Sequence, residues 1–367
     1  MGDPCVVGLD VGGTHSRALL ATVGGRVLGT GRAGGGNPTV LGAEPAIANI
    51  VAALRAALGN VPGDRVEACV VGLAGVSTLI ADPKGPGTLE RAWADAGLSC
   101  PVRIVSDVTV AFAAGTPRPD GTLLVSGTGA VAARMHDRLP ARFRDGYGWL
   151  LGDDGSGFWI GRQAARAAIA AVDGRAPMAE LAKAVLEALL EPASAQSPDA
   201  GVDSRSTSGK ESNTAGEEPL GAAIGEGFAV RGRRRAAELV RAVAAQPTVA
   251  LASLAPLVMA AYELGDPAAQ RIVEGAARVL VESLDGVGPV PGEPVVLGGS
   301  VLVSRGPVFE AVAAAARRRW PDSPLGLARD GAAGAGWLAA RDLLGDEAAA
   351  PVHVRFTGDD RSSAKFS

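Results

Sequence analysis

The chain has 367 residues, 47% of them hydrophobic, and a formal net charge of −4. This length is enough for two domains with hydrophobic cores of their own, and the small negative charge argues against a protein that binds nucleic acid or anionic lipid. No apolar run is long enough to span a membrane, and the first ten residues lack the basic and long apolar segments of a secretion signal, so we expect a cytoplasmic protein.

Two apolar runs near the N-terminus are separated by a pair of glycines. The runs, at 5–9 and 18–23, predict two strands joined by a tight turn. Glycines allow positive φ angles and bring backbone N–H groups close to a ligand, hydroxyls add donors, and a carboxylate at a strand end suits Mg²⁺. We interpret the turn as a phosphate and metal hairpin, with an ordinary glycine-containing β-turn as the alternative. Its candidate residues are Asp10 for Mg²⁺ and Gly12, Gly13, Thr14 and Ser16 for phosphate.

The chain then alternates strands and helices up to about residue 115. We expect three strands within 4–31, a helix at 45–58, a strand at 66–72, a helix at 88–97 with a glycine cap and a strand at 102–105. Ser106 and Asp107 follow the last strand and precede an apolar run, a pattern typical of a helix N-terminus. Asp107 is either a structural cap or the one carboxylate that phosphoryl transfer needs to orient the attacking oxygen.

A second glycine turn follows a turn-rich segment at 116–121, where we place the start of a second domain. An apolar run at 122–125 leads into Ser126, Gly127, Thr128 and Gly129, and another apolar run follows. This repeats the order of strand, small residues and strand, which suggests two related domains that hold one polyphosphate from opposite sides. Neither turn has the spacing of a P-loop or of a Rossmann turn. A chance pair of glycine-rich hairpins is the alternative.

A run of glycine, aromatic and acidic residues at 146–161, GYGWLLGDDGSGFWIG, completes a distinctive order of motifs. With G-L-D-V-G-G-T, S-D-V and S-G-T-G before it, the chain resembles the BadF/BadG/BcrA/BcrD-type ATPase family of the actin–sugar kinase–Hsp70 superfamily over residues of about 4–345. Within the family it is most similar to N-acetylglucosamine kinases. The resemblance implies an α/β fold of two actin-like (ribonuclease H-like) domains with a nucleotide and sugar cleft between them.

The resemblance also implies roles for individual residues. Asp107 would orient and deprotonate the sugar 6-hydroxyl, Thr14 and Thr128 would meet the ATP phosphates, and Asp10 would act through Mg²⁺. The implied sugar-binding residues are Asn37, Asp107, Gly146, Tyr147, Gly148 and Asp153. The implied adenosine turn comprises Gly298, Gly299, Ser300 and Ser304, and the second phosphate turn comprises Gly127, Thr128 and Gly129.

Several of these residues have structural alternatives. Asn37 before Pro38 can be a turn former, Asp153 and Asp154 can be an acidic pair at a helix N-terminus, and the glycines at 298–299 can form a plain strand-to-helix turn. Tyr147 stands where the mammalian enzymes carry tryptophan. This departure weakens the choice of sugar more than the assignment as a kinase.

The three cysteines, Cys5, Cys69 and Cys100, lie far apart in apolar or turn contexts. We expect them to be reduced thiols. Dehydratase activators of this family hold an iron–sulfur cluster through dedicated cysteines, and ROK-type sugar kinases carry a zinc-binding cysteine cluster. Neither pattern occurs in this sequence, and His15 and His136 show no metal-ligand spacing with any cysteine.

The rest of the chain is expected to be mainly helical, with one insertion. We expect helices at 156–172, 178–191, 251–264, 267–284, with Asp266 as N-cap, and 336–344, the last closing against the first domain. Few large apolar residues occur at 193–225, so we expect a flexible surface insertion there, followed by an arginine cluster at 231–235. That cluster is a solvated helix start or a site that steers an anionic partner. The expected domains are 1–115 and 116–350, with a loosely held tail at 351–367.

The sequence therefore predicts an enzyme that uses ATP and Mg²⁺ to phosphorylate an amino sugar, N-acetylglucosamine to its 6-phosphate, with no nucleic acid or membrane partner. The resemblance favours a homodimer. The alternatives are a kinase for glucosamine or an N-acetylmuramic acid derivative, and a non-catalytic regulator that ATP opens and closes. Asn37, Asp107 and Asp153 favour the kinase, because a regulator needs no convergent sugar-contacting groups.

Overall fold

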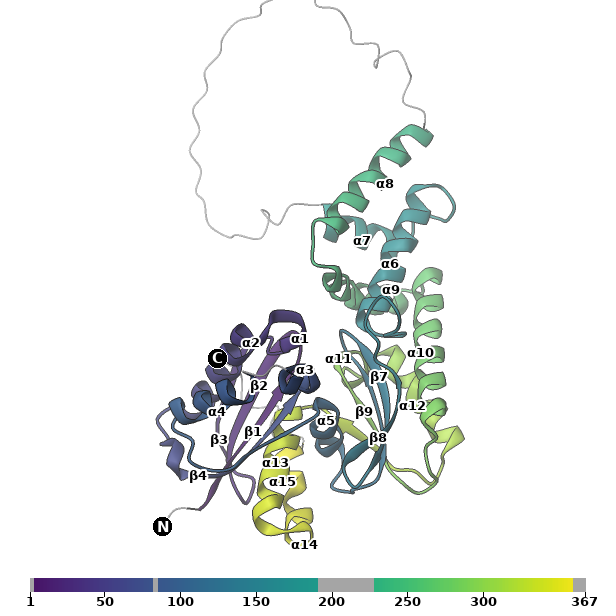
Figure 1. Cartoon of the computed structure of the whole chain (residues 1–367). Coiled ribbons are helices and arrows are strands. Elements are labelled where there is room, and N and C mark those ends of the chain that lie inside the picture. The colour runs from purple at the N-terminus through teal and green to yellow at the C-terminus, as the bar shows by residue number, and fades with distance from the viewer. Residues whose placement is uncertain (1–2, 82–84, 191–227, 359–367) are drawn as a thin grey trace, which may run out of the picture. The chain divides into compact units, whose positions relative to one another are not determined.

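The computed structural model describes residues 3–81, 85–190 and 228–358 (Figure 1). Internal contacts divide the chain into two compact units, Met1–Gly157 with Glu274–Ser367, and Phe158–Val273. The insertion expected at 193–225 lies outside the described residues.

The first unit contains two five-stranded sheets with the same strand arrangement. In each sheet three antiparallel strands form a meander, and two parallel strands extend it on the side of the meander's first strand. The orders are β3-β2-β1-β4-β5 and β10-β9-β6-β7-β8, which confirms the expected pair of related α/β halves. The first sheet consists of β1 (Cys5–Val11), β2 (His15–Thr22), β3 (Val27–Gly34), β4 (Val66–Leu73) and β5 (Val102–Val105). The second consists of β6 (Gly121–Ser126), β7 (Ala130–His136), β8 (Leu139–Asp145), β9 (Val295–Gly298) and β10 (Leu325–Ala328).

Helices cover both faces of the first sheet, which explains why β1 is almost continuously apolar. Val7, Leu9 and Val11 pack with α2 (Ala43–Leu58), whereas the opposite face of β1 packs under α13 (Gly331–Leu344). A Cβ atom on Gly8 would lie 2.1 Å from the backbone nitrogen of Gly336, so α13 crosses β1 at backbone contact. The smaller elements of this half are α1 (Pro38–Leu41), η1 (Gly63–Arg65), α3 (Val76–Ala81) and α4 (Gly85–Asp95).

The C-terminal segment stays on the first sheet. The helix expected at 336–344 is α13, which begins earlier, at Gly331. It packs on the first sheet, as expected, although we had grouped residues up to 350 with the second domain. The loose tail expected from 351 is wrong for its first part, because α15 (His353–Thr357) buries His353 and Phe356. Two short elements precede it, α14 (Asp346–Ala349) and η4 (Ala350–Val352).

Helix α5 (Asp107–Gly115) packs against elements of both halves of the first unit. Its Phe112 lies in a core with Leu123 and Val296 of the second sheet. On the other side, a Cβ atom on Gly334 of α13 would lie 2.2 Å from the carbonyl oxygen of Val110. Small residues thus let α5 and α13 cross closely, just before the expected domain start at residue 116. After β9 the chain forms α11 (Ser300–Val303) and α12 (Pro307–Arg319).

The second unit is helical. Asp266 caps α10 (Pro267–Val287), as expected, by accepting hydrogen bonds from the backbone nitrogens of Ala268 (2.8 Å) and Ala269 (3.1 Å). Its other oxygen accepts from the nitrogen of Leu181, which ties α7 (Glu180–Leu190) to the start of α10. The helix expected at 251–264 is divided into a 3₁₀ segment and an α-helix. The helices are α6 (Gly157–Val172), α7 (Glu180–Leu190), α8 (Phe228–Ala244), η3 (Thr248–Leu254) and α9 (Ala255–Glu263).

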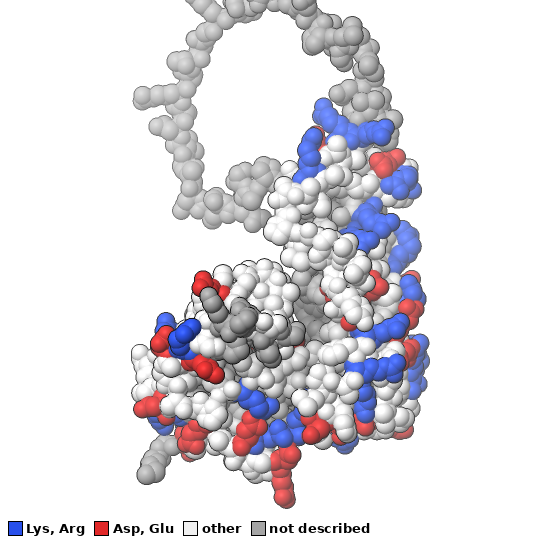
Figure 2. Space-filling view, viewed as in Figure 1, with Lys and Arg blue, Asp and Glu red and all other residues white. Residues whose placement is uncertain are grey.

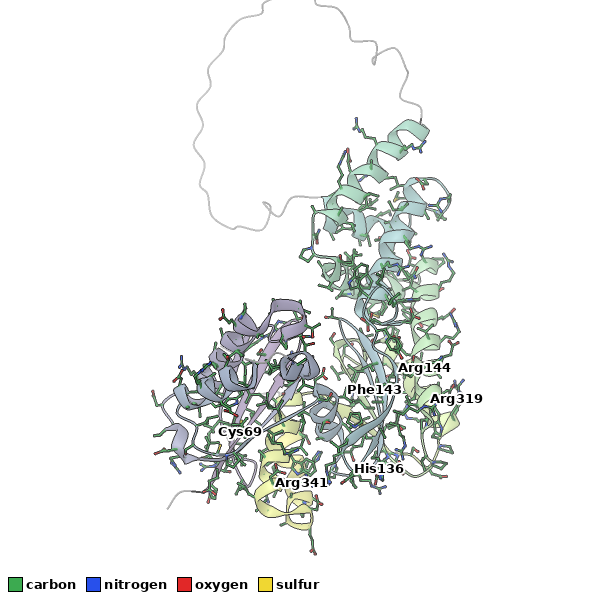
Figure 3. The ribbon with its side chains drawn as sticks, viewed as in Figure 1. Cys69, His136, Phe143, Arg144, Arg319 and Arg341 are labelled. Atoms are coloured by element: carbon green, nitrogen blue, oxygen red, sulfur yellow. The ribbon has the colours of Figure 1, made fainter. Side chains whose placement is uncertain are left out.

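The face in Figure 2 carries acidic and basic side chains side by side. Within the described ranges no single helix is long and apolar enough to cross a membrane; one bent pair, Gly232–Ala244 with Thr248–Glu263, reaches the required length and composition only jointly. All three cysteines are free thiols, and Cys69 lies in β4 of the first sheet (Figure 3).

Candidate functional site

The first glycine turn joins β1 to β2 and leaves open space beside its backbone. The nitrogen of Gly12 donates to the carbonyl of His15 over 2.9 Å, and Gly13 and Thr14 are exposed. Neither Gly12 nor Gly13 has a positive φ. A Cβ atom on Gly13 would meet no atom within 4 Å. The fold therefore does not require glycine at this turn for a left-handed backbone. Glycine instead leaves room for a ligand to approach the backbone closely.

Ser16 does not lie on the surface of this turn, contrary to the expected phosphate contact. Strand alternation turns its side chain to the α2 side of the sheet, and the residue is fully buried. Its hydroxyl oxygen has no hydrogen-bond partner among the described residues, and a Cβ atom on Gly36 would lie 2.7 Å from it. We therefore remove Ser16 from the residues that can reach phosphate.

Three carboxylates surround the end of β1. Asp10 is the last residue but one of that strand, Asp107 begins α5, and Asp330 caps α13 through the nitrogens of Ala332 (3.0 Å) and Ala333 (3.4 Å). Burial raises the pKa of Asp10 to about 7, with further contributions from Asp107 and Asp330 that outweigh the opposing charge of Arg17. The negative charges of Asp107 and Asp330 are thus within electrostatic reach of Asp10.

Asp107 is both close to a helix cap and available for chemistry. Ser106 is the N-cap, since the nitrogen of Val108 donates to its Oγ (3.3 Å) as well as to Oδ1 of Asp107 (3.0 Å). The Ser106 hydroxyl also lies 3.2 Å from Asp107 Oδ1. Burial raises the pKa of Asp107, while these hydrogen bonds lower it. The position of Asp107 at the helix N-terminus is confirmed, with its Oδ1 in local hydrogen bonds, and its catalytic role stays a prediction.

The Asp10 carboxylate fits a hard cation whose other ligands are phosphate oxygens and water. No hydrogen bond engages the Asp10 carboxylate in the described part of the chain, and its pKa is raised first by burial and then by the negative charge of Asp107. Among those residues no group of three or more His, Cys, Asp or Glu side chains is arranged to hold a metal alone. Mg²⁺ commonly uses one or two carboxylates with waters and substrate phosphates, which is what such a site can offer.

The second glycine turn joins β6 to β7 and is braced by Asp153. The nitrogen of Gly127 donates to the carbonyl of Gly129 over 2.8 Å, and Thr128 is exposed. Asp153 Oδ1 accepts from the nitrogen of Ala130 over 3.2 Å, and a Cβ atom on Gly129 would lie 3.0 Å from this carboxylate. Burial raises the Asp153 pKa, the nearby Asp145 and Asp154 raise it further, and backbone hydrogen bonds oppose them.

Asp145, which the sequence analysis missed, organises the segment that contains the proposed sugar-binding residues. Its carboxylate accepts from the nitrogens of Gly146 (2.8 Å), Asp153 (2.7 Å) and Asp154 (2.9 Å), so it closes the loop between them. Gly146 and Gly148 both have positive φ, and Tyr147 is 71% exposed. An acidic residue directly before Gly-x-Gly was the available signal. The loop also lines a pocket, with Arg144, Asp145, Tyr147 and Glu282 among its walls.

The proposed adenosine turn touches the second phosphate turn. Gly299 has a φ of +83°, and a Cβ atom there would lie 2.3 Å from the carbonyl oxygen of Ser126 and 2.7 Å from the nitrogen of Gly127. Glycine is therefore required at this backbone approach. Ser300 and Ser304 are exposed beyond the turn, and the Ser304 hydroxyl donates to the carbonyl of Val301. Gly298 is buried at the end of β9.

Asn37 has the structural role that its place before Pro38 predicts. Its Oδ1 accepts from the nitrogen of Thr39 over 2.9 Å and so caps α1. The loop before it lies on the first turn, because the nitrogen of Gly36 donates to the carbonyl of Gly12 over 3.0 Å. The amide nitrogen of Asn37 and the second lone pair of its Oδ1 are left for a sugar hydroxyl.

The sequence-predicted residues thus fall into two groups. Asp10, Asp107 and the loop of Asn37 gather around the first turn, whereas Asp153 and the adenosine turn gather around the second. Asp330 and Gly331 join the first group and were missed; a Cβ atom on Gly331 would lie 2.5 Å from Asp10 Oδ2. An aspartate before a run of small residues was their signal.

A family model described as the BadF/BadG/BcrA/BcrD ATPase family matches residues 7–322. Among curated proteins, the chain is 26% identical over 173 residues to the N-acetylmuramic acid/N-acetylglucosamine kinase of Clostridium acetobutylicum. The match covers 46% of this chain and 55% of that kinase, so the chain spans about half the length of this curated relative.

Two solved structures share the fold. A proposed N-acetylglucosamine kinase from Chromobacterium violaceum aligns with a TM-score of 0.65 at 20% identity, covering 92% of this chain and 99% of its own. A second proposed N-acetylglucosamine kinase, from Porphyromonas gingivalis, aligns with a TM-score of 0.59 at 18% identity, covering 92% and 98%. These alignments confirm the expected two-domain α/β fold.

Proposed function

The chain belongs to the BadF/BadG/BcrA/BcrD ATPase family, and from this premise we propose that it is a kinase that transfers the γ-phosphate of ATP to an amino sugar, N-acetylglucosamine at its 6-hydroxyl. The observation that carries the proposal is the position of Asp107, at a helix start within electrostatic reach of Asp10 at the first glycine turn. The curated relative's activity on N-acetylmuramic acid and N-acetylglucosamine supports the substrate class.

In this proposal Asp107 orients the sugar hydroxyl and accepts its proton as the bond to phosphorus forms. Phosphoryl transfer depends mainly on positioning and charge stabilisation, and one carboxylate suffices for the nucleophile. Burial raises the pKa of Asp107, which brings its basicity closer to that useful near neutral pH.

The two glycine turns hold the ATP phosphates through backbone nitrogens and through the hydroxyls of Thr14 and Thr128. Both hydroxyls are on exposed turn residues, and Gly13 leaves the approach open. The adenosine lies on the turn of Gly298 and Gly299, with Ser300 and Ser304 beside it. The contact between this turn and Gly127 supports a single nucleotide site.

Mg²⁺ accompanies ATP and neutralises phosphate charge when bound. Asp10 would hold it, and Asp107 and Asp330 would add to the negative potential that attracts it. The sugar is held by Asn37 and by the segment of Gly146, Tyr147, Gly148 and Asp153. Asn37 can donate from its amide nitrogen to a sugar hydroxyl while its oxygen caps α1.

We also propose a division into domains at 1–115 and 116–330, with the C-terminal helices packed on the first domain. The two domains would close around the substrates and exclude water. A cytoplasmic homodimer that binds only ATP and the sugar completes the proposal.

ADP release from ATP and Mg²⁺ tests the proposal, measured with N-acetylglucosamine, N-acetylmuramic acid, N-acetylmannosamine, glucosamine and glucose. We expect the highest kcat/KM with N-acetylglucosamine. If glucosamine is the only sugar of the panel that is phosphorylated, N-acetylglucosamine is not the substrate and glucosamine replaces it in the proposal. ATP hydrolysis at an equal rate with and without every sugar would contradict an amino sugar kinase.

A further inference from the structure

Two arginines continue the line of Asp10 across the first sheet. In the strand register Asp10 of β1 pairs with Arg17 of β2, and Arg17 in turn pairs with Arg32 of β3. Directly paired residues of antiparallel strands have their side chains on one face, with Cβ atoms about 5 Å apart. Asp10, Arg17 and Arg32 therefore form one row.

This row lies where α13 no longer covers the sheet. Leu19 and Ala21, which share the face of Arg17, pack with α13 in the core. That helix begins at Gly331 against the Asp10 carboxylate. Arg17 and Arg32 are exposed on the uncovered part of this face.

The two arginines form no ion pair within the described residues, although the charge of Arg17 acts on the Asp10 carboxylate. Throughout the described ranges, neither Arg17 nor Arg32 has a carboxylate within ion-pair distance. Like charges directly opposite each other destabilise a sheet. Burial, and then Arg32 and Arg17, lower the pKa of the neighbouring His15. The row thus joins two unpaired guanidinium groups to a carboxylate placed for Mg²⁺.

We propose that Arg17 and Arg32 bind the terminal phosphate of the nucleotide beside Asp10. The inference rests on the proposed function, which supplies ATP as the ligand. A guanidinium offers a planar pair of donors that matches phosphate oxygens. The terminal phosphate is the group with the highest charge, and binding it relieves the repulsion between the arginines. Discrimination between ATP and ADP therefore resides in this pair.

Nucleotide affinity measured without sugar tests the inference, by calorimetric titration of ATP and of ADP in Mg²⁺. The variants are Arg17→Gln and Arg32→Gln. The matched control is Arg26→Gln, which changes an exposed arginine at the other end of the same hairpin. We expect Arg17→Gln and Arg32→Gln each to weaken ATP binding by roughly tenfold, the weight of a charge-assisted hydrogen bond, and to leave ADP binding within about twofold. The control should change neither.

An unchanged ratio of ATP to ADP affinity in both arginine variants would overturn the inference. A second measurement excludes a different anion: the KM values of N-acetylmuramic acid and N-acetylglucosamine. If the variants raise only the KM of the acidic sugar and bind ATP normally, the pair recognises the substrate's carboxylate and our assignment is wrong. The titrations contain no sugar and measure nucleotide binding alone. They therefore still test the role of the two arginines if no amino sugar in the panel proves to be a substrate.

Discussion

A single carboxylate, Asp145, fixes the loop that carries the proposed sugar-binding residues. Three backbone nitrogens donate to it over 2.7–2.9 Å, and a Cβ atom on Gly152 would lie 2.1 Å from its Oδ1. The loop has left-handed residues at Asp145 and Asp153, conformations that a non-glycine residue keeps only when its surroundings hold it. Removing the Asp145 carboxylate removes the three hydrogen bonds and, with them, the support for the left-handed conformations of residues 145 and 153.

We expect Asp145→Ala to raise the KM for the sugar by roughly tenfold or more, since hydrogen bonds to a charged group contribute about 1.5–3 kcal/mol each in favourable cases. The KM for ATP should change much less. Steady-state kinetics with each substrate varied in turn measures both. Asp154→Ala is the control, because Asp154 is exposed in the same loop. Equal effects on the sugar and ATP constants would show that Asp145 supports the fold in general.

His353 makes stability depend on pH. Its Nε2–H donates to the carbonyl of Ala113 over 2.7 Å, and burial lowers its pKa below the usual 6.5. Below about pH 6.5 the unfolded chain therefore binds a proton that the folded chain does not, and the free energy of unfolding falls. We expect the melting temperature to fall less in His353→Gln than in the wild type between about pH 7.5 and 5.5. If the melting temperature falls equally in both proteins, His353 is not the source of the pH dependence of stability.

The β-hairpin turns are the elements that give the fold its proposed chemistry, and the first turn can be altered without disturbing the fold. Gly13 has an ordinary φ and open space in the direction of a side chain. Gly299, in contrast, has a positive φ and backbone contacts that no side chain can accommodate. Substitution at Gly13 therefore separates ligand binding from folding, whereas substitution at Gly299 does not.

Gly13→Val should abolish ATP-dependent turnover, because its side chain would occupy the space that the phosphates need. Its melting temperature and its affinity for the sugar alone should remain close to those of the wild type. Turnover paired with calorimetric titration of the sugar tests this. Normal turnover in Gly13→Val would show that the β1–β2 turn is not a phosphate site.

Most elements could be predicted from local patterns. Apolar runs between glycine turns gave β1, β2 and β6, and Asp266 marked the start of α10. Features that depend on long-range contacts could not be predicted. Ser16 is buried because Gly36 lies over it, and the environment of the Asp10 carboxylate depends on α13, which begins beside it at Gly331. The edge strand β8 was missed because most of its residues are exposed and its pattern is weakly alternating.

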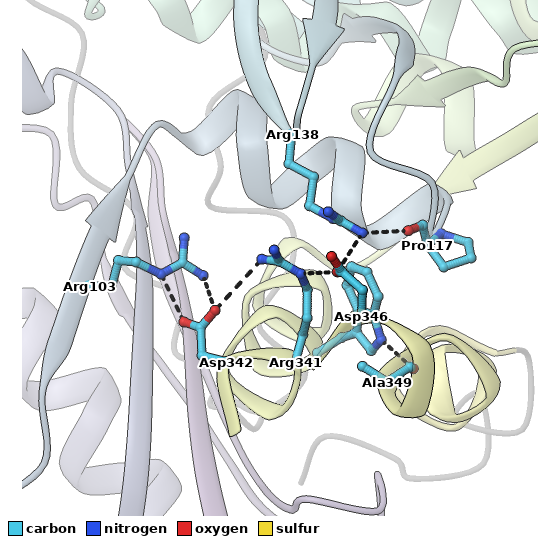
Figure 4. A network of polar contacts seen from close by, with 8 residues as sticks. Arg103, Pro117, Arg138, Arg341, Asp342, Asp346 and Ala349 are labelled. Carbon is cyan, nitrogen blue, oxygen red and sulfur yellow. Dashed lines mark hydrogen bonds and ion pairs between the residues drawn. The ribbon is translucent and has the colours of Figure 1, made fainter. Parts of the chain in front are cut away.

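A polar network joins the two halves of the first unit through Arg138 (Figure 4). Arg138, at the β7–β8 turn, is 8% exposed, and its guanidinium donates to the carbonyl of Pro117 and pairs with Asp346, each over 3.1 Å. It also lies 5.6 Å from the ring centre of Trp337 on α13. A second pair, Arg103 with Asp342, lies at the surface of the same network. The buried arginine thus connects the second sheet to the helices on the first.

We expect Arg138→Gln to lower the free energy of unfolding by about 2 kcal/mol, because the variant loses buried hydrogen bonds and the contact with Trp337. Arg103→Gln is the comparison, and should cost less than about 1 kcal/mol because that pair is exposed. Urea denaturation measures both. Equal costs would mean that Arg138 does not link the halves.

The central claim is that Asp107 is the base of a sugar kinase, and the rate of sugar 6-phosphate formation by Asp107→Asn tests it most directly. Phosphorus NMR with ATP, Mg²⁺ and N-acetylglucosamine measures that product, and titration of ATP checks that the variant still binds nucleotide. The account predicts a kcat lowered by roughly a hundredfold or more, the weight of a positioned base, with ATP affinity nearly unchanged. Sugar phosphate formed by Asp107→Asn at close to the wild-type rate would contradict it.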